Sequence, residues 1–206
     1  MFLDFEGRKI TMDEQSKASS RRKKDWRFGN RWLVGRGIDV GCGPDLLSKE
    51  DWPLVTEVVP YDKELGNVDA QFLPEIKDSE FDFLHSAHCL EHLANARAAM
   101  SNWLRVLKPG GFVICTVPDE LYYECGKWPS RFNSDHRASF TLRPMPIIPG
   151  SINLMNLLWR LNVDVEHVEL LTEGWDRLRF GQDQTLTGAE ASIEFVVRKP
   201  HPARAW

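Results

Sequence analysis

Basic residues, long apolar runs and paired cysteines are all scarce in this chain, and each absence excludes a class of protein. The 206 residues include 26 Lys and Arg against 30 Asp and Glu, a net charge of −4. A duplex-DNA binder normally has a basic surplus, because phosphate neutralisation supplies much of its affinity, so we expect no nucleic-acid partner. No apolar run approaches the roughly 18 residues that span a bilayer. The N-terminus carries acids where a signal peptide has bases, so we expect a cytoplasmic protein without a membrane partner.

The four cysteines are scattered, with no C-x-x-C pair: Cys42, Cys89, Cys115 and Cys125. This distribution argues against a zinc ribbon and against a disulfide framework. Cys42 and Cys89 have no basic sequence neighbour to activate a thiolate, so we interpret them as small packing residues. The chain also lacks internal repeats, and its length suits one domain over residues 1–206.

What the sequence does contain is an alternation of apolar strands and helices. Six stretches have strand character: 37–40, 55–62, 81–86, 112–117, 165–171 and 192–198. Helices are expected over 94–107 and 152–161, and another is expected to begin at Asp45. This alternation predicts an α/β fold with a parallel sheet, and the last two strands are suited to an antiparallel finish.

Two segments stand outside this alternation. Residues 1–34 form a predicted N-terminal helical cap, in which the basic run 21–24 precedes Trp26, Phe28 and Trp32. We interpret the run as a solvated helix face whose aromatic residues dock on the domain, in preference to a nuclear or nucleic-acid tag. Residues 118–150 form a loop-rich insertion with five prolines: Pro118, Pro129, Pro144, Pro146 and Pro149.

Gly41 and Gly43 directly follow the first strand. Glycine tolerates positive φ and lets a ligand approach the backbone. Leu46 stands where the dinucleotide fingerprint has its third glycine. Asp62, at the end of the second strand, is suited to accept both hydroxyls of a ribose. Together these residues predict an adenosine-cofactor site without choosing between cofactors; a plain glycine turn with a solvated aspartate is the alternative.

Five motifs in order make that choice: 38–44 (IDVGCGP), 61–62 (YD), 69–74 (DAQFLP), 81–93 (FDFLHSAHCLEHL) and 104–111 (LRVLKPGG). Over about residues 36–118 the chain resembles the class I S-adenosylmethionine-dependent methyltransferases, particularly the type 11 branch. The resemblance implies a Rossmann-like, seven-stranded, mostly parallel sheet flanked by helices. Its order would be 3-2-1-4-5-7-6, and Ser192–Arg198 would be the antiparallel last strand.

The resemblance also implies which residues hold the methionine part of the cofactor. Gly41 and Gly43 would let the backbone pass close to it, with Cys42 on the same turn. Asp39 would hold the loop and the amino end of the cofactor. Ser86 would place a backbone carbonyl near the methionine ammonium group.

For the adenosine part, the resemblance gives Asp62 the ribose hydroxyls and places Lys63 near adenine. Asp69 would meet the adenine amino group, and Ala70 would offer its amide. The implied activity is methyl transfer from S-adenosylmethionine to a small-molecule acceptor. Two alternatives stay open: an NAD-dependent oxidoreductase on a related fold, and a non-catalytic cofactor-binding partner of another methyltransferase.

An alcohol or phenol acceptor would need a general base, and histidine suits that role near neutral pH. His88, just after the strand that faces the cofactor, is the first candidate, with capping or packing as the alternative. His136, in the insertion, is the second. The polar residues around it and nearby aromatic residues predict substrate binding, or ordinary lid packing: Tyr122, Trp128, Arg131, Asn133 and Asp135. This polar lid favours a small hydroxyl-bearing acceptor, such as a sugar or nucleotide-sugar.

His88, Glu91 and His92 also match H-x-x-E-H, an inverted zinc-protease pattern. On a helix the two histidines would share a face, as metal ligands must. Glu-His-Leu is, however, common at this point of the type 11 sequences that this chain resembles, without a metal. We therefore expect no metal site.

Overall fold

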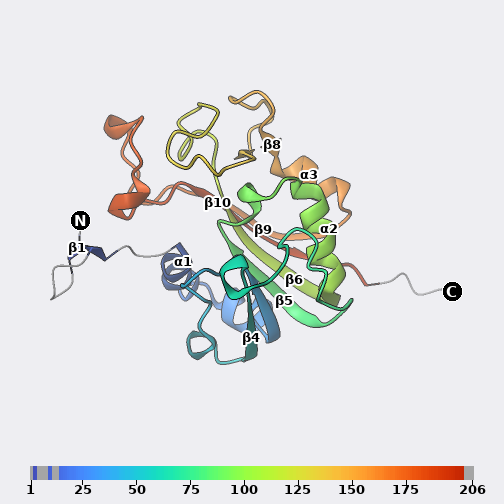
Figure 1. The fold of residues 1–206 in the computed structure, drawn as a ribbon. Coiled ribbons are helices and arrows are strands. Elements are labelled where there is room, and N and C mark those ends of the chain that lie inside the picture. Colours follow the sequence, from blue (N-terminus) through green and yellow to red (C-terminus); the bar gives the residue numbers. More distant parts are fainter. Residues whose placement is uncertain (1, 4–8, 11–13, 202–206) are drawn as a thin grey trace.

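The computed structural model describes residues 2–3, 9–10 and 14–201. Their centre is a six-stranded sheet in the order β4-β3-β5-β6-β10-β9 (Figure 1). In that order the strands are Val55–Tyr61, Gly35–Val40, Phe81–Ala87, Leu107–Pro118, Ser192–Arg198 and Asp164–Leu171. The first four run parallel, whereas β10 is antiparallel to both of its neighbours. The predicted Rossmann-like α/β fold with an antiparallel Ser192–Arg198 strand is confirmed.

The predicted sheet has one more strand, at the edge beyond β4. Among the described residues β4 is the outer strand, and turns follow it. The Asp69 carboxylate accepts a hydrogen bond from the backbone N–H of Gln71 at 2.7 Å, and Leu73 has a φ of 47°. A carboxylate that caps its own turn competes with a sheet ladder, and Pro74 has no N–H to donate to one. The described sheet therefore has six strands in place of the expected seven.

Two α-helices cover one face of the sheet, α2 (Ala96–Val106) and α3 (Leu154–Arg160), within the ranges predicted for them. The Asn95 side chain accepts a hydrogen bond from the Ala98 N–H at 3.0 Å and so caps the start of α2. The helix buries an apolar face that includes Met100 and Trp103, which belong to one core cluster with Leu84 of β5. This cluster is the larger of the two cores.

The other described elements are short: β1 (Phe2–Leu3), β2 (Lys9–Ile10), α1 (Glu14–Arg22), a π-helical turn (Phe28–Trp32), β7 (Phe140–Thr141), β8 (Ile152–Asn153), and 3₁₀ turns at Lys49–Asp51, Lys63–Leu65, Leu90–His92, Arg177–Arg179 and Thr185–Thr187. Within the described ranges, no helix is both long and apolar enough to cross a bilayer.

The helix expected to begin at Asp45 is absent; the described link from β3 to β4 contains turns and one 3₁₀ turn. Both carboxylate oxygens of Asp45 accept hydrogen bonds from Ser16 of α1, at 2.7 and 2.9 Å, instead of capping a helix. The sheet face that such a helix would cover holds a second core cluster. There, Phe28 and Trp32 are packed together with Phe83 and Ile114.

Of the three aromatic residues expected to dock, Phe28 and Trp32 are buried and Trp26 is 69% exposed; residues 1, 4–8 and 11–13 of the predicted helical cap lie outside the described residues. The solvated-face interpretation of the basic run is wrong for Arg22, which is 1% exposed. Its Nε donates to Glu194 Oε2 of β10 at 2.6 Å, and its Nη1 lies 2.8 Å from His85 Nε2. The other ring nitrogen of His85 is 2.6 Å from Asp39 Oδ1, so a buried polar chain joins α1 to three strands.

Candidate active site

The turn after β3 combines two glycines with positive φ, 73° at Gly41 and 52° at Gly43. A Cβ on Gly41 would lie 2.5 Å from both Cβ and Sγ of Cys89, so this position admits no side chain. A Cβ on Gly43 would meet no atom within 4 Å. The first glycine is therefore needed for packing, and the second leaves the backbone open to a ligand.

Asp62 follows β4 and is hydrogen-bonded to this turn. Its Oδ2 accepts from the Gly43 N–H at 3.0 Å, and its Oδ1 accepts from the Glu64 N–H at 2.9 Å. An ionised carboxylate oxygen has about two acceptor sites, so each oxygen keeps capacity for a ribose hydroxyl. The carboxylate is thus held in one orientation by the groups beside it.

Two hollows open at this end of the sheet. The larger, about 430 Å³, is lined in part by predicted cofactor residues: Gly41, Asp62, Lys63, Asp69 and Ala70. The smaller, about 180 Å³, is lined in part by Asp39, Gly41 and Cys42. Gly41 and His88 line both hollows, so they lie where the two meet. The larger volume is in the usual range for a small-molecule site.

Asp69 and Ala70 belong to a turn whose backbone carbonyls lie against the side chains of Tyr61 and Trp103. The Ala70 carbonyl accepts from the Trp103 indole N–H at 2.8 Å, and the Tyr61 hydroxyl, which donates to Glu75 Oε2 at 2.5 Å, lies 3.3 Å from the Asp69 carbonyl. The Ala70 amide donates to no group among the described residues. An amide presented in this way can donate to a ring nitrogen of a purine.

Asp39 and Ser86 are buried, and their side chains hydrogen-bond to backbone groups of neighbouring segments. Asp39 Oδ2 accepts from the Leu47 N–H at 2.7 Å, so it is bonded to the segment that follows the glycine turn. The Ser86 hydroxyl donates to the Val40 carbonyl at 2.9 Å and ties β5 to β3. At the end of β5, the residues that line the smaller hollow are Ala87 and His88.

The two cysteines at the site are protonated thiols. Burial, reinforced by the charge of Asp39, raises the pKa of Cys42 to about 11. Burial also raises the pKa of Cys89, to which the Glu91 charge adds. Neither forms a thiolate at neutral pH, in agreement with their interpretation as packing residues.

The two candidate bases lie in different surroundings. His88 has a φ of 55°, and its side chain lies between Ser192 and Glu91: Nε2 is 3.1 Å from the Ser192 hydroxyl and Nδ1 is 3.3 Å from Glu91 Oε1. His136 is 9% exposed, with Nδ1 2.7 Å from Glu124 Oε1. His88 lines both hollows, whereas His136 is absent from the described lining of either.

Of the insertion residues expected to bind substrate, Asp135 lines the larger hollow. Tyr122 packs edge-on against Trp175 at 5.0 Å, and the Asn133 side chain accepts from the Asp135 N–H at 3.0 Å. Trp128 and Arg131 are exposed. These four residues are not among the described residues that line the larger hollow.

Sequence reasoning missed Arg137 and His92, which also line the larger hollow. Arg137 offered no signal beyond its proximity to His136. The signal for His92 was the H-x-x-E-H pattern. In the structure, however, the two histidines of this pattern do not share one helix face. His88 precedes the 3₁₀ turn Leu90–His92, and the second histidine beside Glu91 and His92 is His136.

The methyltransferase domain family matches residues 13–173 of the chain. No curated protein matches it in sequence. Its fold is similar to that of an S-adenosylmethionine-dependent methyltransferase from Archaeoglobus fulgidus, with a TM-score of 0.61 and 15% identity over 92% of this chain and 96% of that one. A corresponding enzyme from Mesorhizobium loti gives a TM-score of 0.59 and 14% identity, over 91% and 99%.

A third similar structure is phosphoethanolamine N-methyltransferase 2 from Haemonchus contortus, in complex with S-adenosyl-L-methionine. It has a TM-score of 0.58 and 15% identity, over 98% of this chain and 60% of that one. These likenesses establish the fold, and the family match extends over most of the chain. The chain therefore belongs to the methyltransferase domain family and has a class I methyltransferase fold.

Proposed function

We propose that this enzyme methylates a hydroxyl oxygen of a small-molecule acceptor, with His88 as the general base. The observation that carries the proposal is the position of His88, which lines both the hollow at the glycine turn and the larger hollow beside it. An imidazole at this junction can reach an acceptor that lies next to the methyl group. Histidine also exchanges its proton near neutral pH, as a base for an alcohol requires.

The residues present fit S-adenosylmethionine. The open backbone at Gly43 suits a methionine chain, the held carboxylate of Asp62 suits a ribose, and the amide of Ala70 suits a purine. When bound, the cofactor supplies an electrophilic methyl group whose bond to sulfur breaks, with its electron pair returning to sulfur, as the acceptor oxygen bonds to carbon. His88 takes the proton of the acceptor hydroxyl. The other residues of the site orient the acceptor and exclude water. Positioning of the reactants alone lowers the reaction barrier by on the order of 7–11 kcal/mol in favourable cases.

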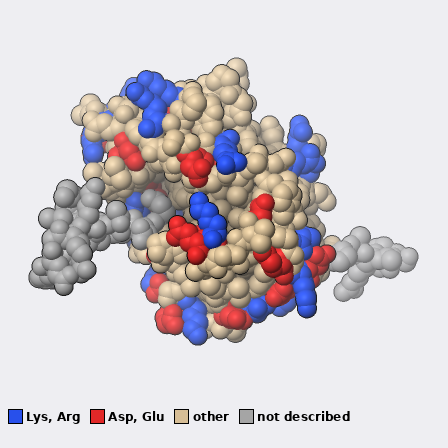
Figure 2. Space-filling view, viewed as in Figure 1, with Lys and Arg blue, Asp and Glu red and all other residues tan. Residues whose placement is uncertain are grey.

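The charge around the site supports a small acceptor. The larger hollow carries Asp62, Asp69 and Asp135 against Lys63 and Arg137, so it has no cationic track for a polyphosphate backbone. Figure 2 shows Lys and Arg interspersed with Asp and Glu on the face viewed there. A neutral polyol such as a sugar matches this mixture of donors and acceptors better than a nucleic acid does.

The test is an acceptor screen that follows S-adenosylhomocysteine release with sugars, nucleotide-sugars, phenols, amines and RNA. Turnover confined to hydroxylated small molecules supports the proposal, and turnover confined to amines or RNA contradicts it. Calorimetric titration with S-adenosylmethionine and with NADH serves as the control for cofactor choice. Tight donor binding without turnover on any acceptor would favour the non-catalytic alternative.

Replacing Asp62 by alanine is expected to weaken S-adenosylmethionine binding about 10- to 100-fold. The substitution removes a charged acceptor for the ribose hydroxyls, and hydrogen bonds to charged groups contribute roughly 1.5–3 kcal/mol. It also releases the Gly43 amide from its 3.0 Å bond to Asp62. Calorimetry measures the change, and exposed Glu64→Ala is the matched control. An unchanged affinity for Asp62→Ala would remove this residue from the ribose site.

A further inference from the structure

Glu91 is buried without the partners that a carboxylate needs. It is 0% exposed, and neither of its carboxylate oxygens accepts a hydrogen bond from any described group. His88 Nδ1 lies 3.3 Å from its Oε1. Removing an ionised carboxylate from water without compensation costs several kcal/mol, so buried carboxylates are normally paired, hydrogen-bonded or bound to metals.

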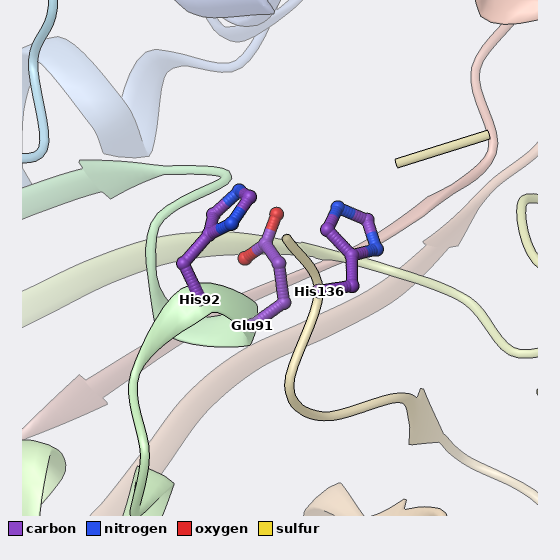
Figure 3. Close-up of side chains that lie close together, drawn as sticks. All are labelled: Glu91, His92 and His136. Carbon is purple, nitrogen blue, oxygen red and sulfur yellow. The ribbon is translucent and has the colours of Figure 1, made fainter. Parts of the chain in front are cut away.

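Two imidazoles flank this carboxylate (Figure 3). Glu91, His92 and His136 each offer one ligand atom, and the three atoms lie within 4.8 Å of one another. The rings of His92 and His136 meet edge to face, with centroids 4.9 Å apart. Backbone bonds fix the insertion here, because the Glu91 carbonyl accepts from the Arg137 and Ala138 amides at 2.8 and 3.0 Å.

Both imidazoles are oriented by a second carboxylate. His92 Nδ1 lies 3.1 Å from Asp135 Oδ2, and His136 Nδ1 lies 2.7 Å from Glu124 Oε1. When Nδ1 carries the proton in each of these contacts, Nε2 presents its lone pair. A histidine that donates one ring N–H to a carboxylate while its other nitrogen binds a metal is the usual outer-shell arrangement of metal sites.

We propose that Glu91, His92 and His136 bind a divalent transition-metal ion of the Zn²⁺ type. Two imidazoles and one carboxylate are a known ligand set for zinc, and three protein ligands leave a further position open. In a tetrahedral site with bonds of about 2.0–2.1 Å the ligand atoms lie about 3.3 Å apart. Binding would therefore draw the three atoms together from their present spacing. The insertion and the 3₁₀ turn Leu90–His92 would be joined by the ion.

One ligand of the proposed site, His92, lines the larger hollow. His92 and Asp135 line the larger hollow together with His88, so the ion adjoins the space beside the methyl group. A bound cation lowers the pKa of an oxygen ligand and orients it. The ion would hold the acceptor hydroxyl while His88 takes its proton; this assignment rests on the proposed hydroxyl methylation, whereas the metal site itself does not.

The experiment is calorimetric titration of chelator-treated, full-length protein with Zn²⁺, with Co²⁺ absorption spectra as a second readout of imidazole ligation. We expect one site per chain. Glu91→Gln and His136→Ala should each weaken Zn²⁺ binding at least about 100-fold, and Glu124→Gln by about 10- to 100-fold through the orientation of His136. His201→Ala, at an exposed histidine, should leave the affinity unchanged.

Two outcomes overturn the metal site: no Zn²⁺ binding by protein that binds S-adenosylhomocysteine, or equal affinity in wild type and Glu91→Gln. Folding of each variant is checked by thermal unfolding, in which Zn²⁺ should raise the wild-type midpoint but not that of Glu91→Gln. Methyl transfer that is insensitive to chelation removes the ion from catalysis and leaves the proposed function intact. Zn²⁺ binding without turnover of any hydroxylated acceptor leaves the site standing and contradicts the proposed acceptor.

His136→Ala separates the acceptor side from the donor side of the site. We expect altered acceptor kinetics with unchanged S-adenosylmethionine affinity, because His136 is absent from the described lining of the cofactor hollows. Steady-state kinetics and donor calorimetry on the same preparation measure both quantities. Weakened donor binding with normal acceptor kinetics would show that this histidine acts on the cofactor.

Discussion

Replacing His88 by alanine is expected to lower kcat by roughly 10²–10⁴, the usual contribution of a general base. The affinity for S-adenosylmethionine should change little, because the groups that fit the ribose and purine belong to other residues, Asp62 and Ala70. A base must lose its proton to act, so the acidic limb of the kcat–pH profile should also change in the variant. Steady-state kinetics over pH, on the best acceptor of the screen, provide the measurement.

The matched control is His201→Ala, which removes an exposed imidazole. A second control is His88→Gln, which keeps a hydrogen-bonding side chain near Ser192 but cannot act as a base near neutral pH. If His88→Gln retains the wild-type kcat, the role of His88 is to position its neighbours. If both His88 variants are fully active, proton removal belongs to another group or to solvent.

Replacing Arg22 by methionine is expected to lower the free energy of unfolding by about 3–5 kcal/mol, the range measured when one partner of a buried ion pair is removed. The guanidinium is buried, donates to Glu194 and contacts His85. Arg21, whose Nη2 donates to Glu194 at 2.9 Å, remains but is partly exposed. Urea unfolding measures the loss, with exposed Lys24→Met as the control that should stay within about 0.5 kcal/mol. A loss below about 1 kcal/mol would mean that Arg21 alone compensates Glu194.

The same pair predicts a pH dependence. Burial works to raise the pKa of Glu194, but the charges and hydrogen bonds of Arg22 and Arg21 outweigh it and hold the pKa below its usual range. A carboxyl whose pKa is lower in the folded state contributes stability above its unfolded pKa, about 4.3, and loses it as the pH falls through the folded value. Wild type should therefore lose more stability than Arg22→Met on acidification below about pH 4.3.

The parts of the fold that sequence predicts are those set by local patterns. The apolar run 112–117 and the two glycines after β3 each determine a short segment, and both lie within or beside the expected elements. The proximity of Gly41 and Asp62 was predictable for a similar reason, because parallel strands bring their ends to one edge of the sheet.

What sequence reasoning missed depends on contacts between distant segments. Nothing near Arg22 indicates that its partner is Glu194, 172 positions later. The expected helix does not begin at Asp45, whose carboxylate accepts hydrogen bonds from Ser16 of α1 instead of capping a helix. Likewise H-x-x-E-H suggested that His88 and His92 share a helix face, whereas a turn with a positive φ at His88 separates them and the insertion supplies His136.

The short link between β3 and β4 has a practical consequence. Because this link contains no α-helix, Phe28 and Trp32 cover the sheet there, and they precede the first motif on which the resemblance to methyltransferases rests. A recombinant fragment trimmed to begin at the glycine-rich strand would leave Phe83 and Ile114 facing water. A recombinant version of the protein should therefore retain Phe28 and Trp32, which belong to the hydrophobic interior.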